Sequence, residues 1–179
     1  MLIFAQTTAY VDALYNILRE RYTDEVTRYH SRIKPERRKK QLLFDFLQGK
    51  GKIMIVTSAF SMGIDVPDIE LVVHFNAPIS MTDYIQQIGR AGRDGRKAHC
   101  ILFYDQNGDD DAISASFIKK SKKQSAKAAK TIKSNLNQVH NFIHNDNCMV
   151  CDILEYQGQH ETKTCKRCTV CAQKRRNSK

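Results

Sequence analysis

The sequence predicts an α/β fold, in which a parallel sheet has helices on both faces and is followed by a small helical domain. Three observations predict it. Short apolar runs alternate with amphipathic helical patterns through residues 1–108, which is typical of a parallel sheet. Beyond Asn107-Gly108 the pattern becomes helical, so residues 109–179 are assigned to a second domain. Five of the six cysteines lie near the end of that second domain.

Five apolar runs are expected to form the strands of the sheet. Each is short, and turns or helical patterns separate it from the next run. In chain order the expected strands are residues 2–5, 26–29, 53–56, 71–75 and 98–104. Ligands on parallel sheets bind beyond the carboxyl ends of the strands, so the loops after the first four strands are where a site is expected.

Helices are expected between these strands. Residues 8–21 form the first, because Val11, Leu14 and Leu18 share one stripe. Pro35 fits the first turn of a second helix that runs to Gly49. The capping-box pattern of residues 80–83 opens a third. In the second domain, five apolar residues recur at spacings of three and four and predict an amphipathic helix: Ala129, Ile132, Leu136, Val139 and Ile143.

The net charge of +10 is concentrated in two blocks. Seven lysines and no acid lie from Lys119 to Lys133, and seven basic residues and no acid lie from Lys163 to Lys179. The two blocks carry +14, so the other residues carry 10 − 14 = −4. Such blocks suit a polyanion, nucleic acid above all. The alternative is a solvated lysine-rich helix face and a frayed tail.

Two classes of protein are excluded or disfavoured at this point. No apolar run approaches the roughly 20 residues that a membrane-spanning helix needs, so no membrane partner is expected. The chain opens with a strand-like run, Leu2–Ala5, and not with an export signal. We therefore expect an intracellular protein, in the nucleus of a eukaryote or in the cytoplasm or nucleoid of a bacterium.

A glycine–arginine loop, residues 86–95 (QQIGRAGRDG), carries the strongest functional signal. The third helix is expected to stop at Gly89. Arg90 and Arg93 are three apart, so they project to the same side if the helical twist persists. Two guanidiniums on a glycine-rich turn suit phosphate oxygens. An exposed basic turn is the alternative.

Residues 57–68 (TSAFSMGIDVPD) follow a buried strand directly. Together with the glycine–arginine loop they resemble motifs V and VI of superfamily 2 helicases. The words SMGIDVPD and QQIGRAGRDG resemble the RecQ family of DNA helicases, although Ser61 stands where that family usually has glycine. Residues 2–7 and 29–31 fall where the family has its strand motif and its "YHA" segment.

The resemblance implies a RecA-like second lobe of a helicase motor. Its implied catalytic residues are Arg93 as arginine finger, Arg90 beside it and Gln86 in the same network. Gly63 and Asp65 are implied in nucleotide binding together with the two arginines. The implied DNA contacts are Tyr29, His30, Ser31, Thr57 and Ser58. The intact enzyme would use ATP and Mg²⁺ to move 3′ to 5′ on single-stranded and forked DNA.

The sequence lacks the two motifs that hold the nucleotide phosphates and Mg²⁺ for phosphoryl transfer. It contains neither a G-x-x-x-x-G-K-[ST] phosphate loop nor an acidic magnesium box of the DExH type. We therefore expect a fragment that does not hydrolyse ATP alone and whose partner is a first lobe outside this chain. A free-standing zinc-dependent DNA-binding or regulatory module is the alternative. An RNA helicase of the same superfamily would leave the cysteines unexplained.

The cysteines predict a zinc site. Cys165, Cys168 and Cys171 lie in one Cys-x-x-Cys-x-x-Cys run, and Cys148 or Cys151 completes a tetrahedral Zn²⁺ site. A resemblance of residues 148–159 to the RecQ zinc-domain phrase favours Cys148 as the fourth ligand. No open coordination position is implied, so the zinc is expected to be structural. Reduced cysteines in a small core, or a site that combines His140, His144 and a cysteine, are the alternatives.

Overall fold

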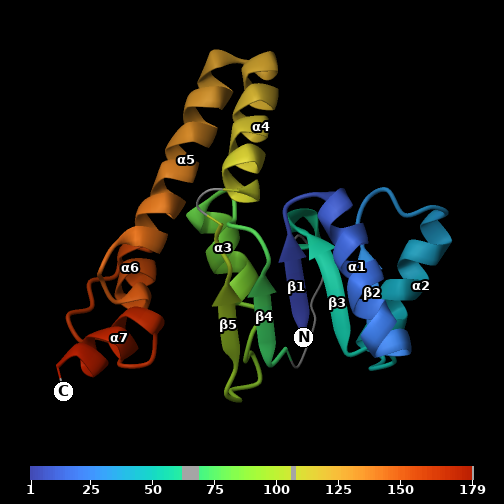
Figure 1. Ribbon diagram of the computed structural model, residues 1–179, viewed down its shortest axis with the longest axis horizontal. Coiled ribbons are helices and arrows are strands. Elements are labelled where there is room, and N and C mark those ends of the chain that lie inside the picture. The colour runs from blue at the N-terminus through green and yellow to red at the C-terminus, as the bar shows by residue number, and fades with distance from the viewer. Residues whose placement is uncertain (62–68, 106–107, 179) are drawn as a thin grey trace.

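The computed structural model describes residues 1–61, 69–105 and 108–178. The implied nucleotide-binding residues Gly63 and Asp65 lie outside the described residues. Five parallel strands form one sheet in the order β2-β3-β1-β4-β5 (Figure 1). In chain order they are β1 (Leu2–Ala5), β2 (Val26–Tyr29), β3 (Ile53–Thr57), β4 (Leu71–His74) and β5 (His99–Leu102). The predicted parallel sheet is confirmed.

Helices cover both faces of the sheet, as predicted. Successive strand residues point to opposite faces, so Ile3 and Phe4 belong to different halves of the core. On the Ile3 face, Val11 of α1 (Thr8–Tyr22) is buried in the core. On the Phe4 face, Phe46 of α2 (Glu36–Leu47) is buried instead. The helix α3 (Met81–Ile88) covers the same face as α2, over β4 and β5.

The boundaries differ from the predictions in a few places. Pro35 has an extended backbone, φ −70° and ψ 166°, and precedes α2 as its N-cap. The last strand is shorter than expected because its final rung, from Phe103 N–H to the His74 carbonyl (2.9 Å), lies where β4 ends. Two short 3₁₀ turns, η1 (Thr23–Glu25) and η2 (Ser58–Ser61), follow α1 and β3.

The second domain is built on a helical hairpin that leaves the sheet beyond the carboxyl end of β5 (Figure 1). It consists of α4 (Asp109–Gln124) and α5 (Ala126–His144). The short helices α6 (Met149–Tyr156) and α7 (Thr169–Asn177) lie beside the base of the hairpin. In the predicted stripe of α5, Val139 packs on Met81 and Tyr84 of α3, so the hairpin is anchored to the sheet domain. No helix in the described ranges is long and apolar enough to cross a bilayer.

The acidic run at residues 109–111 begins α4 and contains a buried carboxylate. Asp110 is buried, and its carboxylate accepts the backbone N–H groups of Ala77 (3.0 Å) and Asp105 (2.8 Å). These bonds tie the start of α4 to the loops after β4 and β5. Burial raises the pKa of Asp110, while the amide donors oppose that rise.

A buried histidine links the sheet to α3. The His74 ring stacks on Phe4 (centroids 5.3 Å apart) and contacts Tyr84 (5.0 Å). Its Nε2 lies 2.7 Å from Oε1 of Gln87, a buried residue of α3, so Nε2 carries the proton and donates. Burial lowers the pKa of His74 to about 4, and the bond to Gln87 opposes the shift only partly.

Acidification should therefore destabilise the fold through His74. The folded-state pKa lies below the ordinary value of 6.5, so this contribution is complete above pH 6.5 and is lost as the pH falls toward 4. The full loss is about 3 kcal/mol in the free energy of unfolding. Urea titrations at pH 7 and pH 4.5 should show a smaller pH dependence for His74→Gln than for the wild type. The exposed-site control His99→Gln should keep the wild-type dependence; equal dependence in all three proteins would contradict the prediction.

Candidate functional site

The glycine–arginine loop is held by its own backbone. Ser80 caps α3 as predicted, since its Oγ accepts the Asp83 N–H (3.0 Å) and donates to the Asp83 carboxylate (2.8 Å). Beyond the helix end at Gly89, Gly92 donates its N–H to the Ile69 carbonyl (3.0 Å). Gly92 has φ +65°, and a Cβ there would lie 2.8 Å from the Arg96 carbonyl oxygen, so the turn requires glycine.

The loop lies at the amino end of β4, and not at the carboxyl ends where a site was expected. Ile69, which pairs with Ala91 and bonds Gly92, comes two residues before β4 begins. The reason is topological: a helix between parallel strands runs back across the sheet, so the end of α3 returns to the amino ends. The predicted DNA contacts Thr57 and Tyr29 do lie at the carboxyl ends of β3 and β2.

The two loop arginines have different environments. Arg90 is only 4% exposed, and its guanidinium carbon lies 5.9 Å from the centre of the Phe60 ring. Arg93 is exposed, and its Nε donates to the Gly89 carbonyl (3.0 Å) at the end of α3. The helical twist that would align residues three apart stops at Ile88. One arginine is therefore part of the packed interior, whereas the other is presented at the surface.

Phe60 joins the predicted segments to one another. It is 1% exposed, and its ring lies edge-on to Tyr29 (centroids 5.2 Å apart) as well as beneath Arg90. Tyr29 ends β2, Phe60 lies in η2 just after β3, and Arg90 follows α3. These three segments, far apart in the sequence, thus share one packed contact. The sequence analysis gave Phe60 no role. The one feature that could have singled it out is its aromatic side chain among the small residues of Thr57–Ser61.

The remaining predicted residues of the first domain are split between surface and interior. Gln86 is exposed on α3, while its neighbour Gln87 is buried and bonds His74. Thr57 and Ser58 are half-buried and Ser31 is exposed. His30 is buried, and its Nε2 donates to the Asp12 carboxylate (3.1 Å), because its Nδ1 accepts the Arg32 N–H (3.3 Å). His30 therefore fixes the turn that exposes Ser31.

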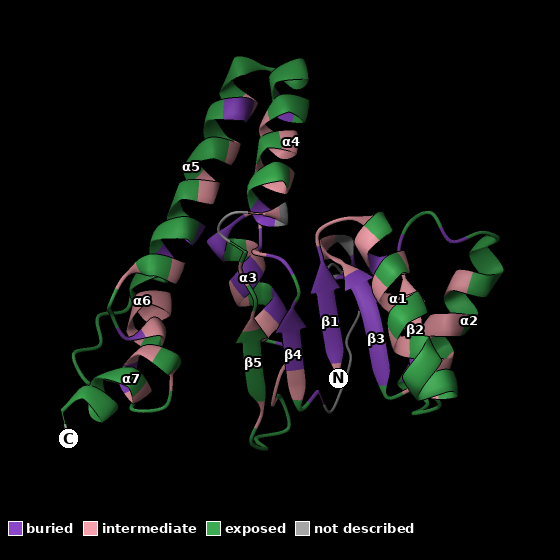
Figure 2. Ribbon diagram, in the orientation of Figure 1, coloured by how far each residue is buried: buried purple, intermediate pink, exposed green. Residues whose placement is uncertain are grey.

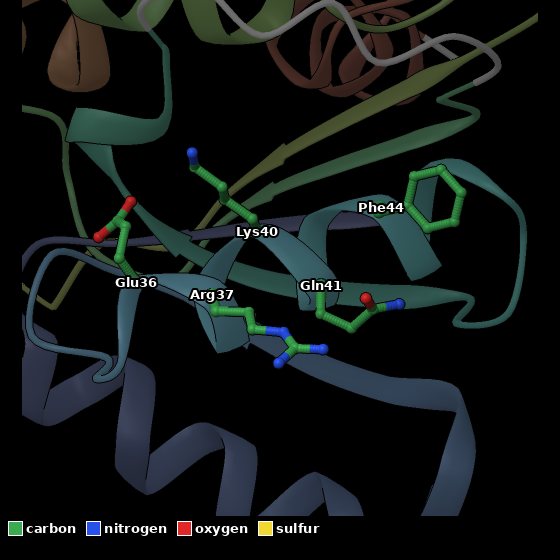
Figure 3. A pocket seen from close by; sticks show the side chains of 5 residues that line it. All are labelled: Glu36, Arg37, Lys40, Gln41 and Phe44. Atoms are coloured by element: carbon green, nitrogen blue, oxygen red, sulfur yellow. The ribbon is translucent and has the colours of Figure 1, made fainter.

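One surface pocket lies beside these residues, and a second pocket lies apart from them. One of about 300 Å³ lies beside His30, and its lining includes the cationic Arg28, Arg32, Lys34 and Arg38. Asp12 lies in the same pocket and pairs with Arg28 (2.7 Å). The other, of about 430 Å³, is lined by α2 residues, among them Phe44, and by none of the predicted site residues (Figure 3). The first pocket can accept an anion next to the predicted DNA contacts.

Four thiols meet in the second domain. The Sγ atoms of Cys148, Cys165, Cys168 and Cys171 all lie within 4.8 Å of one another. Cys148 precedes α6, Cys168 caps α7, and Cys171 lies in the first turns of α7, so the cluster joins these helices to the loop between them. Cys151 is not in the group, and its thiol donates to the Lys163 carbonyl (3.5 Å).

Backbone amides point at the sulfurs of this cluster. Cys165 N–H lies 3.2 Å from Cys148 Sγ, and Cys168 N–H lies 3.2 Å from Cys165 Sγ. Burial alone would raise the pKa of Cys148, but the amide and thiol hydrogen bonds outweigh burial and lower it to about 6. Burial and the neighbouring thiols raise the pKa of Cys171 to about 12. One thiolate forms readily, whereas four together need a central cation.

The donor set therefore fits a tetrahedral Zn²⁺ held by four thiolates. Such a site has no open position, and bound zinc would supply a cross-link between α6 and α7 and no reaction chemistry. The two histidines of the alternative site lie elsewhere. His140 and His144 are exposed, their ring centroids are 4.3 Å apart, and His144 packs against Tyr104 (5.2 Å).

Comparison with known proteins identifies the two parts of the chain. A family model described as the helicase conserved C-terminal domain matches residues 1–95, and one described as RecQ zinc-binding matches residues 109–172. The chain belongs to the RecQ family of helicases, and the two models match a helicase C-terminal domain followed by a zinc-binding domain. This RecQ-family region is 31% identical over 174 residues to the ATP-dependent DNA helicase RecQ of Bacillus subtilis, covering 97% of this chain and 28% of that protein.

One further relative and one solved structure are also similar to this chain. The RecQ-family chain is 32% identical over 159 residues to the ATP-dependent DNA helicase hus2/rqh1 of Schizosaccharomyces pombe, covering 87% of the chain and 12% of that protein. The structure of Saccharomyces cerevisiae Dbp5 bound to RNA and ADP BeF3 matches with a TM-score of 0.53 at 25% identity, covering 75% of this chain and 38% of that one. The chain thus spans less than a third of either RecQ relative.

Proposed function

We propose that this chain is the C-terminal part of the catalytic core of a RecQ-like 3′–5′ DNA helicase. In this role it supplies an arginine finger and DNA contacts to a first ATPase lobe. The observation that carries the proposal is the pair of arginines in the glycine–arginine loop. Arg90 is packed on Phe60 and anchors the loop, and Arg93 is presented at the surface five residues beyond Ile88, where α3 ends.

The chemistry of a guanidinium explains this division of roles. A transferring phosphoryl group spreads negative charge over its oxygens, and a rigidly placed arginine stabilises that charge without reorganising. The loop is held in place because Gly92 donates its N–H to the Ile69 carbonyl and Arg90 is buried. ATP and Mg²⁺ would be held by the first lobe, since this sequence has no phosphate loop. Arg93 would then approach the nucleotide when the two lobes close.

The opposite end of the sheet is proposed to hold DNA. Tyr29, Ser31, Thr57 and Ser58 lie at or just beyond the carboxyl ends of β2 and β3, where hydroxyl groups can bond strand phosphates. Dbp5, a structural relative, is bound to RNA and a nucleotide in its solved structure. Separate ends for nucleotide and DNA let closure at one end move the strand at the other.

Reconstitution with a separately expressed first lobe tests this proposal. The chain alone is expected to show no DNA-stimulated ATP hydrolysis above background, because the phosphate cradle is absent from its sequence. Mixing it with a first lobe of a RecQ-family helicase should restore hydrolysis that depends on DNA. Turnover by the isolated chain, or DNA binding by the chain with no restored hydrolysis, would contradict the enzyme role and favour a free-standing module.

A further inference from the structure

The helix α2 carries exposed apolar side chains on its outward face. Phe44 is 54% exposed, and Leu47, one turn further on, is 36% exposed. The opposite side of α2 faces the core, where Phe46 is buried. Arg37 lies two turns before Phe44 and Lys40 one turn before it, so helical spacing places all four side chains on the outward face. We call Arg37, Lys40, Phe44 and Leu47 the α2 stripe.

A surface pocket of about 430 Å³ follows the α2 stripe. It is lined by Glu36, Arg37, Lys40, Gln41 and Phe44. Figure 3 shows Arg37 and Gln41 on one flank of the helix and Lys40 on the other, with Phe44 at one end. All five side chains come from α2 and are exposed, so the helix supplies one wall of the pocket. A partner that lies along α2 would supply the other wall.

The charges on the α2 stripe select an acidic partner. Arg37 and Lys40 are exposed, and neither takes part in an ion pair among the described residues. Glu36 is the one acid in the pocket lining, and its carboxylate is paired with Lys39 (2.8 Å). Arg37 also lies in the first turn of α2, near the positive end of the helix dipole, where an anion is favoured. Carboxylates of a partner would therefore meet cations that the fold leaves without a paired acid.

The apolar part of the stripe favours a protein over DNA. Leu47 offers no group to a phosphate or to the hydrogen-bonding edge of a base, whereas aromatic and arginine side chains are typical of protein interfaces. The helix α2 runs from the carboxyl end of β2 back to the amino end of β3, so Phe44 lies toward the end of the sheet opposite the proposed DNA contacts. Figure 2 shows α2 at the outer edge of the molecule, away from the α4–α5 hairpin.

The spacing of the stripe describes the partner further. Arg37 and Phe44 are seven residues apart, which is a rise of about 10 Å along the helix. A partner helix that carries acids two turns away from an apolar residue matches this spacing. A second copy of the chain matches it less well, because the net charge of +10 makes two copies repel one another.

We propose that the α2 stripe is a docking surface for an acidic amphipathic helix of a partner protein. The apolar face of that helix would cover Phe44 and Leu47, and its carboxylates would pair with Arg37 and Lys40. The inference goes beyond the proposed function, since no residue of the stripe is assigned to nucleotide or DNA. A second protein could thus be held on the helicase core while both of those sites stay open.

Fluorescence anisotropy with a designed peptide tests this surface. The labelled probe is a synthetic amphipathic helix with Leu and Phe along one face and Glu and Asp on both flanks. The full chain should bind it, and Phe44→Ala should weaken binding by about tenfold, because an aromatic anchor carries much of the energy of an interface. Arg37→Gln with Lys40→Gln should weaken binding several-fold and flatten its salt dependence. Phe44 is exposed, so Phe44→Ala should melt as the wild type does.

Two matched variants and a second peptide serve as controls. Phe103→Ala removes a phenylalanine of similar exposure (55%) beyond β5 and should bind the probe as the wild type does. Lys127→Gln with Lys130→Gln removes two exposed charges from α5 and should also leave binding unchanged. A probe whose Leu and Phe are replaced by Ala should bind far more weakly. No binding of the first probe, or equal losses in both double variants, would overturn the proposal, since equal losses indicate attraction by net charge alone.

The same Phe44→Ala variant separates this partner from other occupants. Displacement of the probe by single-stranded DNA would assign the stripe to DNA. A dimer that light scattering detects in the wild type and that Phe44→Ala abolishes would assign it to a second copy. Reduced ATPase of the reconstituted core in Phe44→Ala would assign it to the first lobe. Each of these three results would overturn the docking surface, whereas probe binding lost in Phe44→Ala without any restored ATPase would overturn the helicase role alone.

Discussion

Arg93→Ala is expected to lower DNA-stimulated ATP hydrolysis of the reconstituted core by about 10³-fold or more, since arginine fingers contribute about 10³–10⁵ in rate. Arg93 is exposed, so the variant should fold and melt as the wild type does. The loss would then be one of transition-state stabilisation and not of structure. Fixed-time assays of phosphate release at saturating ATP and DNA measure the hydrolysis rate, and a melting curve measures the stability of the variant.

Two neighbouring arginines, Arg90 in the loop and Arg96 just after it, serve as controls. Arg96 is also exposed, but it is paired with Asp94 and lies near Glu70 (3.7 Å), so Arg96→Ala should cost only a few-fold in rate. Arg90→Ala should lower both the rate and the melting temperature, because Arg90 is buried against Phe60. An Arg93→Ala core that keeps its rate within a few-fold of the wild type would remove the arginine-finger role.

Loss of one cluster thiol is expected to abolish zinc binding and unfold the α6–α7 segment. Metal binding to thiolate sites in small domains contributes about 10–16 kcal/mol, which then becomes folding free energy. In the described part of this segment only Cys148 and Cys171 are buried, while α6 adds the partly buried Met149 and Ile153, which pack on the core between α3 and α5. Cys171→Ser, or removal of zinc by a chelator, should therefore release one zinc per chain and expose the amides of α6 and α7 to exchange.

Cys151→Ser is the matched control, since Cys151 is a neighbouring thiol outside the cluster. It should retain one zinc per chain, as should His140→Gln. Metal content by atomic absorption and amide exchange by mass spectrometry report the two effects separately. Zinc loss in Cys151→Ser, or full zinc content in Cys171→Ser, would show that the ligand set is different.

Residue patterns predicted most of the sheet domain because its signals are local. Val11, Leu14 and Leu18 mark α1 by their spacing alone, and Ser80 with Asp83 marks the start of α3. The five strands were expected within a few residues of where they lie. The helices α6 and α7 were not expected, because a cysteine-rich segment of that length has no clear helical period.

The sequence predicted which residues belong to the candidate site but not how they are arranged in space. Arg90 and Arg93 looked equivalent in the sequence because a continued helical twist would place them on one side. The helix α3 ends at Ile88, before both of them, and the chain beyond it buries Arg90 and exposes Arg93. Gln86 and Gln87 are adjacent and identical, yet only Gln87 faces His74. Such differences depend on which residue meets a distant partner, and no local period encodes that.

The amino-acid sequence by itself determined the parallel sheet, the caps and glycines of the arginine loop, and the thiols able to hold zinc. These follow from backbone geometry and side-chain chemistry within a few residues of each position. Tertiary structure alone decided that the arginine loop lies at the amino ends of the strands, that Asp110 anchors the hairpin, and that Phe60 lies between Tyr29 and Arg90. Each of these depends on contacts between residues separated by many positions, which form only when the whole core packs.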